Sequence, residues 1–303
     1  MIKNLIHPMR AAFLLCLVLA GCASVSGVTT SVIADKNVEY VLTGIGSPTV
    51  VFENGLDGRL EWWAQIIPEI SKETRVFAYN RPGIGGSTEV TTPREGETVI
   101  HACPTGYSLE DDSISTPRDG ETVIQELRTL LHAKGIAPPY VLVGHSLGGL
   151  YMQLYARRYP DEVAGLVLVD STHPEQLKGA GSRENWPGWF NTLLEVSLSD
   201  AGLKELEAIS ITGSEMLALP AFTGKPVIVL SAQKPMEETS ELAKYANSKR
   251  IDIARLHPGA KQVWVDSGHA IPLEKPEAVI AAVREILSML KAQSATKQAQ
   301  VQP

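Results

Sequence analysis

The stretch Tyr140-Val141-Leu142-Val143-Gly144-His145-Ser146-Leu147-Gly148-Gly149 decides the fold of this chain. Its first four residues are apolar and predict a buried strand, and helical spacing follows at 147–159. A serine in so sharp a strand-to-helix turn occupies strained backbone, so it needs small residues two positions before and after it. The Gly-x-Ser-x-Gly spacing therefore predicts that Ser146 is a nucleophile at the end of a strand, with a helix N-terminus directed at it.

Predicted strands and helices alternate on both sides of this turn. Residues 49–52 and 163–169 are continuous apolar runs, as expected of strands buried on both faces of a sheet. Helix-length patterns separate such runs, which predicts an α/β fold with a mostly parallel central sheet flanked by helices. The other predicted strands are 38–42, 75–79, 140–143, 226–230 and 262–265, and the main predicted helices are 59–72, 119–134, 147–159 and 276–291.

The composition excludes several classes of protein. The chain has 303 residues, 44% of them hydrophobic, which excludes collagen-like, coiled-coil and wholly disordered chains. Its net charge is −7, with 27 Lys and Arg against 34 Asp and Glu and no dense basic run, so we expect no nucleic-acid partner. Three cysteines are too few for a disulfide framework and no metal-binding spacing occurs, so we expect no metal or other cofactor.

The turn at Ser146 and the alternating pattern resemble the α/β-hydrolase superfamily, in particular its serine esterases and lipases. The resemblance covers nearly all of the chain after its N-terminal leader and implies a hydrolase domain at 32–291. It also implies a helical lid inserted after the sixth strand of the fold, here at about 171–225. The chain order expected of such a site is serine, acid, histidine.

The same resemblance implies the partners of the serine. A general base should follow the last strand, where Trp264-Val265-Asp266-Ser267-Gly268-His269 supplies His269. Asp170 closes the strand at 163–169 and is the favoured acid, because polar residues at the carboxyl ends of parallel strands gather at one edge of the sheet. Glu237 and Glu238 follow the next strand and remain the alternative acids. His145 adjoins the serine but belongs to the turn and is expected to pack under it, and His173 and His257 are weaker candidates for the base.

An acyl-transfer site also needs two backbone N–H groups that bind the oxyanion. The resemblance implies that Leu147, directly after the serine, supplies one of them. The second is expected from Leu56, in the turn that follows the strand at 49–52. Trp62 and Trp63 come next and belong either to an acyl pocket or to the core.

These parts predict a serine hydrolase that cleaves a small-molecule carboxylic ester through an acyl-enzyme intermediate. Acyl transfer, thioester or lactone hydrolysis, and cofactor-free haloperoxidase chemistry use the same three residues and remain open. A different class of protein, a membrane-tethered binding lipoprotein that retains a hydrolase shell, is the further alternative.

The N-terminus predicts export and lipid attachment. Residues 1–21 hold a basic start followed by an apolar run of signal-peptide length, and they end before Cys22. Leu19-Ala20-Gly21-Cys22 resembles the lipobox of bacterial lipoproteins, which implies acylation of Cys22 and anchoring in the cell envelope. By the same resemblance Ala23 favours the outer membrane, facing the periplasm. An ordinary secretory signal with a chance cysteine remains the alternative.

Four further segments complete the predicted organisation. Residues 22–31 are expected to form a short tether, and residues 292–303 a disordered polar tail. A loop at about 90–116 holds the first copy of an eleven-residue duplication, in which 90–100 returns as 114–124. The lid segment holds Trp186, Trp189 and Phe190 and two expected short helices, near 188–198 and 200–210.

Overall fold

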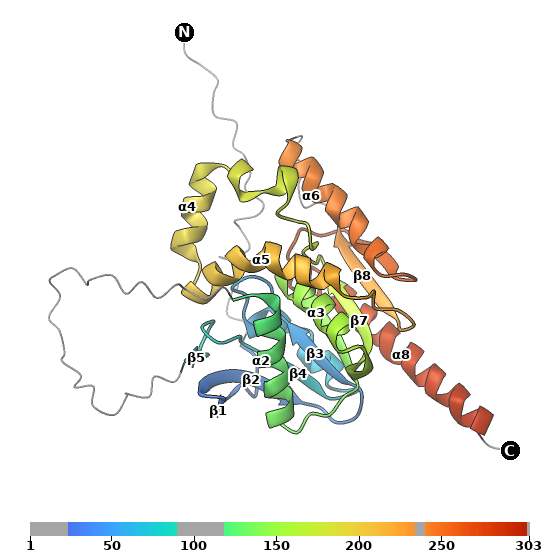
Figure 1. Cartoon of the computed structure of the whole chain (residues 1–303). Coiled ribbons are helices and arrows are strands. Elements are labelled where there is room, and N and C mark those ends of the chain that lie inside the picture. The colour runs from blue at the N-terminus through green and yellow to red at the C-terminus, as the bar shows by residue number, and fades with distance from the viewer. Residues whose placement is uncertain (1–23, 90–117, 234–239, 302–303) are drawn as a thin grey trace, which may run out of the picture.

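A computed structural model describes residues 24–89, 118–233 and 240–301 of the chain. Nine strands of these residues form one sheet in the order β1-β2-β4-β3-β6-β7-β8-β9, with β5 paired to β2 (Figure 1). The six strands from β4 to β9 in this order pair in parallel, which confirms the predicted mostly parallel sheet. The strands are β1 (Thr29–Ile33), β2 (Lys36–Thr43), β3 (Thr49–Glu53), β4 (Val76–Tyr79), β5 (Thr88–Glu89), β6 (Tyr140–His145), β7 (Val163–Val169), β8 (Val227–Ala232) and β9 (Lys261–Val265).

Helices cover both faces of the sheet. One face packs against α2 (Gly120–Ala133) and α3 (Leu147–Arg158), and the other packs against α1 (Ile67–Ile70) and α8 (Pro276–Val301). In Figure 1, α2 and α3 lie in front of the strands and α8 lies behind them. The remaining helices are α4 (Gly188–Ser197), α5 (Asp200–Ala218), α6 (Glu241–Asp252) and α7 (Ile271–Glu274).

Alternate residues of the central strands enter two separate hydrophobic cores. In β6, Leu142 faces the core that contains α2 and α3, whereas Val141 and Val143 face the core that contains α8. Successive side chains of a strand point to opposite faces, so a strand covered on both sides must be apolar throughout. Each such Val or Leu contributes about 1.5–3 kcal/mol through burial, which explains the unbroken apolar runs in the sequence.

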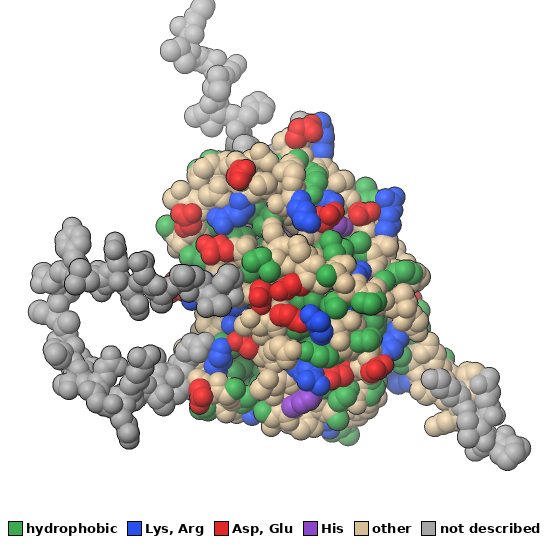
Figure 2. All heavy atoms as spheres, viewed as in Figure 1, with side chains coloured by type: hydrophobic (Ala, Val, Ile, Leu, Met, Phe, Trp, Pro, Cys, Tyr) green, Lys and Arg blue, Asp and Glu red, His purple; other side chains and the backbone are tan. Residues whose placement is uncertain are grey.

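The segment between β7 and β8 is largely helical, as predicted. It contains α4 and α5, and α5 continues to Ala218, beyond the expected end near residue 210. In this chain the insertion follows β7, which is the seventh strand in chain order when the short strands β1 and β5 are counted. Figure 2 shows acidic and basic side chains interspersed over the face that carries α2, α3 and α5.

The structure differs from three expectations about element boundaries. The expected helix at 59–72 is instead a 3-10 turn, Leu60–Trp63, followed by α1, because Pro68 has no N–H and its ring clashes with a preceding carbonyl. Residues 29–31, expected in the tether, belong to β1. The final helix continues to Val301, so 292–301 are helical and not a disordered tail. That stretch contains no Gly or Pro and is rich in Ala and Gln, which favour helix.

Several predicted features lie outside the described residues. They are the signal segment 1–21 with Cys22, the duplicated loop at 90–116, and the alternative acids Glu237 and Glu238. No helix within the described ranges is long and apolar enough to cross a membrane.

Candidate active site

Ser146 lies between β6 and α3 in a backbone conformation that side chains rarely adopt. Its φ is 51° and its ψ is −122°. The small residues predicted around it are required by close packing: a Cβ on Gly144 would lie 2.5 Å from the Gly148 carbonyl oxygen, and one on Gly149 would lie 2.2 Å from Ser171 Oγ. The glycines therefore allow the tight turn that raises the Ser146 hydroxyl above the sheet.

The structure brings Ser146, His269 and Asp170 together in one chain of hydrogen bonds. His269 follows β9, and its Nε2 lies 3.0 Å from Ser146 Oγ. Its Nδ1 lies 2.6 Å from Asp170 Oδ2. A carboxylate only accepts hydrogen bonds, so Nδ1 carries the proton and donates a hydrogen bond to Asp170. The Nε2 atom then accepts a hydrogen bond from the serine hydroxyl. This arrangement suits proton removal from Ser146 during nucleophilic attack.

Asp170 is held from every side as a buried carboxylate. It ends β7 with a φ of 39°, is 4% exposed, and accepts the backbone N–H of Ala232 on Oδ1 at 3.0 Å. Burial alone would raise the pKa of this carboxyl, but hydrogen bonds and charges from His269 and Arg250 outweigh it and lower the pKa below its usual value. Asp170 therefore stays ionised at neutral pH.

Arg250 is a residue of this site that sequence reasoning missed. It lies in α6, and its guanidinium binds both carboxylate oxygens of Asp170, with Nε 2.8 Å from Oδ1 and Nη2 3.2 Å from Oδ2. Nothing in the local sequence distinguishes Arg250 from an ordinary helix-surface arginine. Only the packing of α6 against the end of β7 reveals its contact.

The other histidines considered as bases have structural partners. His145 Nε2 donates to the backbone carbonyl of His269 at 2.9 Å, and its ring stacks on Trp62 with centroids 5.0 Å apart. Burial, helped by the nearby His269, lowers the pKa of His145 to about 3, so His145 is neutral at pH 7 and supports the loop that carries His269. His173 pairs with Asp252, and His257 with Gln153.

The tryptophans at 62 and 63 differ in burial and in their neighbours. Trp63 is fully buried and packs on Phe52 with ring centroids 4.9 Å apart, so it belongs to the core. Trp62 is partly exposed and lies against His145 at the edge of the site.

The two predicted oxyanion donors belong to segments that adjoin Ser146. Leu147 begins α3, so its N–H has no acceptor within the helix. On the other side, a Cβ on Gly55 would lie 3.1 Å from Ser146 Cβ, which places the Gly55–Leu56 peptide against the nucleophile. The turn 53–58 and the start of α3 also touch, since a Cβ on Gly148 would lie 2.3 Å from the Asn54 carbonyl oxygen.

Two other features of the described residues bear on where an ion or ligand could bind. The described residues contain no group of three or more His, Cys, Asp or Glu side chains that could hold a metal ion. A pocket of about 460 Å³ lies between the β1–β2 hairpin and α2, lined by residues such as Ile33, Val38 and Leu130. Its lining contains none of the residues around Ser146, so it is separate from the candidate active site.

Comparison with known proteins agrees with this fold. The sequence model of the family described as alpha/beta hydrolase fold matches residues 48–206, more than half of the chain. A (lyso)-N-acylphosphatidylethanolamine lipase from Bos taurus is 28% identical over 267 residues, covering 76% of this chain and 70% of the lipase.

Two solved structures show the same fold. A putative lipase from Acinetobacter baumannii superposes with a TM-score of 0.62 at 19% identity, covering 96% of this chain and 99% of the lipase. An enol-lactonase from Burkholderia xenovorans superposes with a TM-score of 0.57 at 19% identity, covering 86% of this chain and 100% of the lactonase. At these identities the superpositions support the fold alone.

Proposed function

Because the chain belongs to the alpha/beta hydrolase fold family, a family of hydrolases, we propose that it is a serine hydrolase that cleaves carboxylic esters through an acyl-enzyme intermediate. The observation that carries this proposal is the chain of contacts from Ser146 Oγ to His269 Nε2 at 3.0 Å and from His269 Nδ1 to Asp170 at 2.6 Å. A binding protein has no need to hold a serine in strained backbone beside a correctly oriented imidazole.

In the proposed reaction Ser146 Oγ attacks the ester carbonyl carbon while His269 Nε2 takes its proton. The tetrahedral oxyanion then accepts hydrogen bonds from the backbone N–H groups of Leu56 and Leu147. His269 gives its proton to the leaving alcohol as the C–O bond breaks, which leaves an acyl group on Ser146. Water deprotonated by His269 releases the acid and restores the serine.

Asp170 holds the reactive tautomer of His269 throughout this cycle and stabilises its cation. Its position at the end of β7 supports Asp170 over Glu237 and Glu238 as the acid, since its carboxylate already occupies the site at Nδ1 of His269. Arg250 binds both oxygens of this carboxylate, including Oδ2, which also contacts the imidazole.

The substrate class proposed is an ester with a short to medium acyl chain. The insertion between β7 and β8 brings Trp186 and Phe190 together, with ring centroids 5.3 Å apart, and both pack against the same hydrophobic core as Leu56. Trp189, in contrast, is 49% exposed. We propose that this insertion is the lid of the acyl site.

The test combines covalent labelling with a substrate panel. A fluorophosphonate probe should label the wild-type chain at Ser146 and leave Ser146→Ala unlabelled. The panel holds p-nitrophenyl esters of increasing acyl length, a thioester and a lactone, and the proposal expects the highest kcat/KM on a short or medium ester. No labelling and no turnover on any substrate would leave the binding-lipoprotein alternative, whereas preferred turnover of the thioester or lactone would replace the substrate class alone.

We further propose that the enzyme is exported and anchored in the bacterial envelope through an acylated Cys22, probed below by substitution. The support is the sequence pattern Leu19-Ala20-Gly21-Cys22 after an apolar run of signal-peptide length.

A further inference from the structure

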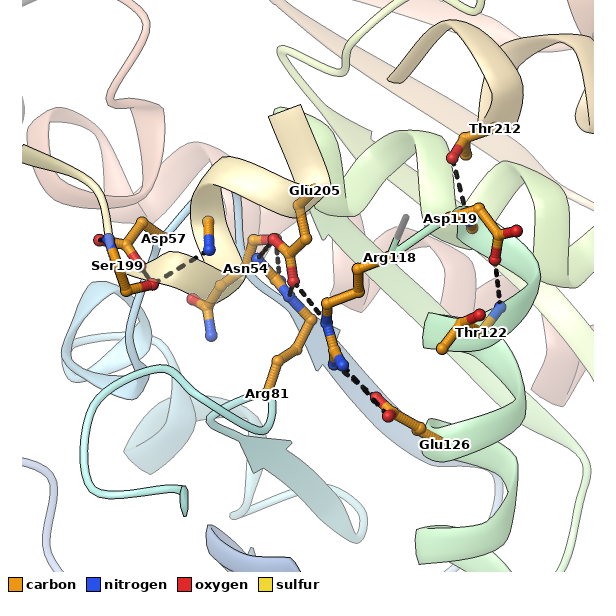
Figure 3. A network of polar contacts seen from close by, with 12 residues as sticks. Asn54, Asp57, Arg81, Arg118, Asp119, Thr122, Glu126, Ser199, Glu205 and Thr212 are labelled. Atoms are coloured by element: carbon orange, nitrogen blue, oxygen red, sulfur yellow. Dashed lines mark hydrogen bonds and ion pairs between the residues drawn. The ribbon is translucent and has the colours of Figure 1, made fainter. Parts of the chain in front are cut away.

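A buried ionic network lies directly beside the proposed oxyanion donor and has no part in the reaction above. Its centre is Arg81, two residues after β4, which is only 1% exposed. The guanidinium binds Glu53 through Nη1 at 2.6 Å. It also binds both oxygens of Glu205, through Nε and Nη2 at 2.8 Å each (Figure 3). Both carboxylates are fully buried, so the network costs considerable desolvation unless each partner is well oriented.

The same guanidinium also holds the backbone of the turn that carries Leu56. Arg81 Nη1 donates to the Asn54 carbonyl oxygen at 2.8 Å, and Nη2 donates to the Gly55 carbonyl oxygen at 2.7 Å. In a trans peptide the C=O and the following N–H point in opposite directions. Because the Gly55 carbonyl is directed at Arg81, the N–H of Leu56 is directed away from it.

The turn that carries Leu56 also adjoins the nucleophile. Gly55 lies so near Ser146 that a Cβ on the glycine would come within 3.1 Å of Ser146 Cβ and 3.2 Å of His145 Nδ1. The turn therefore binds the guanidinium through its carbonyl oxygens and lies against the nucleophile at Gly55. A rotation of the Gly55–Leu56 peptide would break the hydrogen bond to Arg81 and turn the N–H out of the site.

We propose that Arg81 is a positioning residue that fixes the Leu56 N–H toward the oxyanion, and that Glu205 on α5 aims the guanidinium for this purpose. The inference rests on the function proposed above, because it assigns a role within that oxyanion hole.

A second contact supports the link between α5 and this turn. Ser199 caps the N-terminus of α5 by accepting the Gly202 N–H at 3.0 Å, and its Oγ donates to Asp57 Oδ1 at 2.5 Å (Figure 3). Asp57 and Gly55 belong to the same turn. Helix α5 thus contacts the oxyanion turn at two places, directly through Ser199 and indirectly through Glu205 and Arg81. The position of this inserted helix therefore sets the geometry of the proposed oxyanion hole.

Two Arg81 variants separate positioning from charge. Arg81→Lys keeps one positive charge between the two carboxylates, but an ammonium group is a point charge without the planar fork that reaches both carbonyls and both acids. Arg81→Gln removes the charge as well. For each variant, kcat and KM are measured on a p-nitrophenyl ester and referred to active sites titrated with a fluorophosphonate, which removes any contribution from misfolded protein.

Arg118→Gln is the matched control. Arg118 Nε also binds Glu205, at 3.1 Å, and its other nitrogens bind Glu126, yet it donates to none of the carbonyls of the oxyanion turn. This variant disturbs the same network by one charge, and its kcat should stay within twofold of the wild type.

Loss of a whole oxyanion donor lowers kcat by about 10²–10³, and a misdirected donor loses part of that. We therefore expect Arg81→Lys to lower kcat per titrated site at least fivefold while KM changes less than threefold. A smaller fall in kcat, or an equal fall in Arg118→Gln, would overturn the inference. If neither Arg81 variant folds, Glu205→Gln is measured instead, and a fall in kcat per titrated site of less than fivefold in that variant would overturn the inference.

Failure of the proposed function has a different signature. In that case the wild-type chain itself would neither react with the fluorophosphonate nor turn over an ester, and both proposals would fall. Failure of the positioning role alone would leave the wild type active and the Arg81 variants equally active per titrated site.

Discussion

Replacing Asp170 with asparagine is the most informative single change in the candidate triad, because it removes one charge and leaves the shape of the side chain intact. Asp170 Oδ1 accepts from two donors, Ala232 N and Arg250 Nε, while Oδ2 faces His269 Nδ1 and Arg250 Nη2. An asparagine must place its NH2 group on one of these two sides.

The surrounding donors decide which side that is. If the NH2 group takes the Oδ1 position, it confronts two donors, whereas at the Oδ2 position it confronts only Arg250 Nη2 and the proton of His269 Nδ1, which the ring is able to move to Nε2. A buried donor without an acceptor costs about 1–3 kcal/mol, so the amide turns its NH2 toward His269. The imidazole then carries its proton on Nε2 and no longer accepts the proton of Ser146.

The expected cost is large. Holding the wrong tautomer in a serine–histidine–acid triad lowers kcat by about 10⁴, which corresponds to about 5.5 kcal/mol of transition-state stabilisation. Arg250 already neutralises part of the Asp170 charge. The electrostatic share is accordingly smaller here, and we expect a fall in kcat on the order of 10³–10⁴.

The assay is steady-state hydrolysis of a p-nitrophenyl ester at pH 8, with the melting temperature of each variant measured in parallel. Glu237→Gln and Glu238→Gln are the controls, and both should keep kcat within twofold of the wild type. A fall of less than tenfold in folded Asp170→Asn, or a larger fall in either glutamate variant, would refute this reasoning and move the acid to the later loop.

Three further outcomes are expected. Burial lowers the pKa of His145 to about 3 and of His257 to about 4, from an ordinary 6.5. Below pH 6.5 these two imidazoles therefore bind protons in the unfolded chain but not in the folded chain. The free energy of unfolding is therefore highest above pH 6.5 and falls on acidification, by about 2 kcal/mol per histidine at pH 5. Urea unfolding at pH 7 and at pH 5 measures this fall, and His257→Gln should remove about half of it. Gly148→Ala places a Cβ 2.3 Å from the Asn54 carbonyl oxygen and should destabilise the fold by about 1–3 kcal/mol and abolish turnover, whereas Gly188→Ala, with nothing within 4 Å, should do neither; thermal melts and ester assays distinguish them. Cys22→Ser should move the protein from the membrane fraction to the supernatant, and retention in the membrane fraction would contradict lipid anchoring.

The sequence was sufficient for the parts of the fold that follow from local patterns. Continuous apolar strands and helix spacing predicted a parallel sheet covered on both faces, and the glycines around Ser146 predicted a turn that the packing of Gly144 and Gly149 now explains. The sequence could also predict His269 and Asp170 as candidates, because each follows a strand whose carboxyl end lies at the same edge of the sheet as Ser146.

Contacts between residues that are distant along the chain could not be predicted from local sequence patterns. Arg250 and Glu205 lie in helices whose sequence periodicity reports only which face is buried, and their partners Asp170 and Arg81 are 80 and 124 residues away along the chain. Arg81 itself sits in an ordinary Arg-Pro-Gly turn. The role of Arg81 can be inferred only from its hydrogen bonds to the turn at 53–58 and to Glu205 on α5.

The boundary errors have local causes that outweigh average helix propensity. Pro68 interrupted an apolar face that otherwise fitted one continuous helix. At the other end of the chain, the polar composition predicts disorder, but residues such as Ala, Gln and Lys form helix readily once α8 has been started by its packing on the sheet.

The positive φ of Ser146 has a consequence for selection on heat resistance. Holding a residue with a Cβ in this region costs about 1–3 kcal/mol, and glycine is free of that cost. Among the residues that the structure describes, the side chain of Ser146 makes one hydrogen bond, to His269, so Ser146→Gly loses little else. A library screened for thermal tolerance alone should therefore enrich glycine at position 146 and yield sturdier, inert variants, and only a screen that scores turnover at the same time would retain the serine.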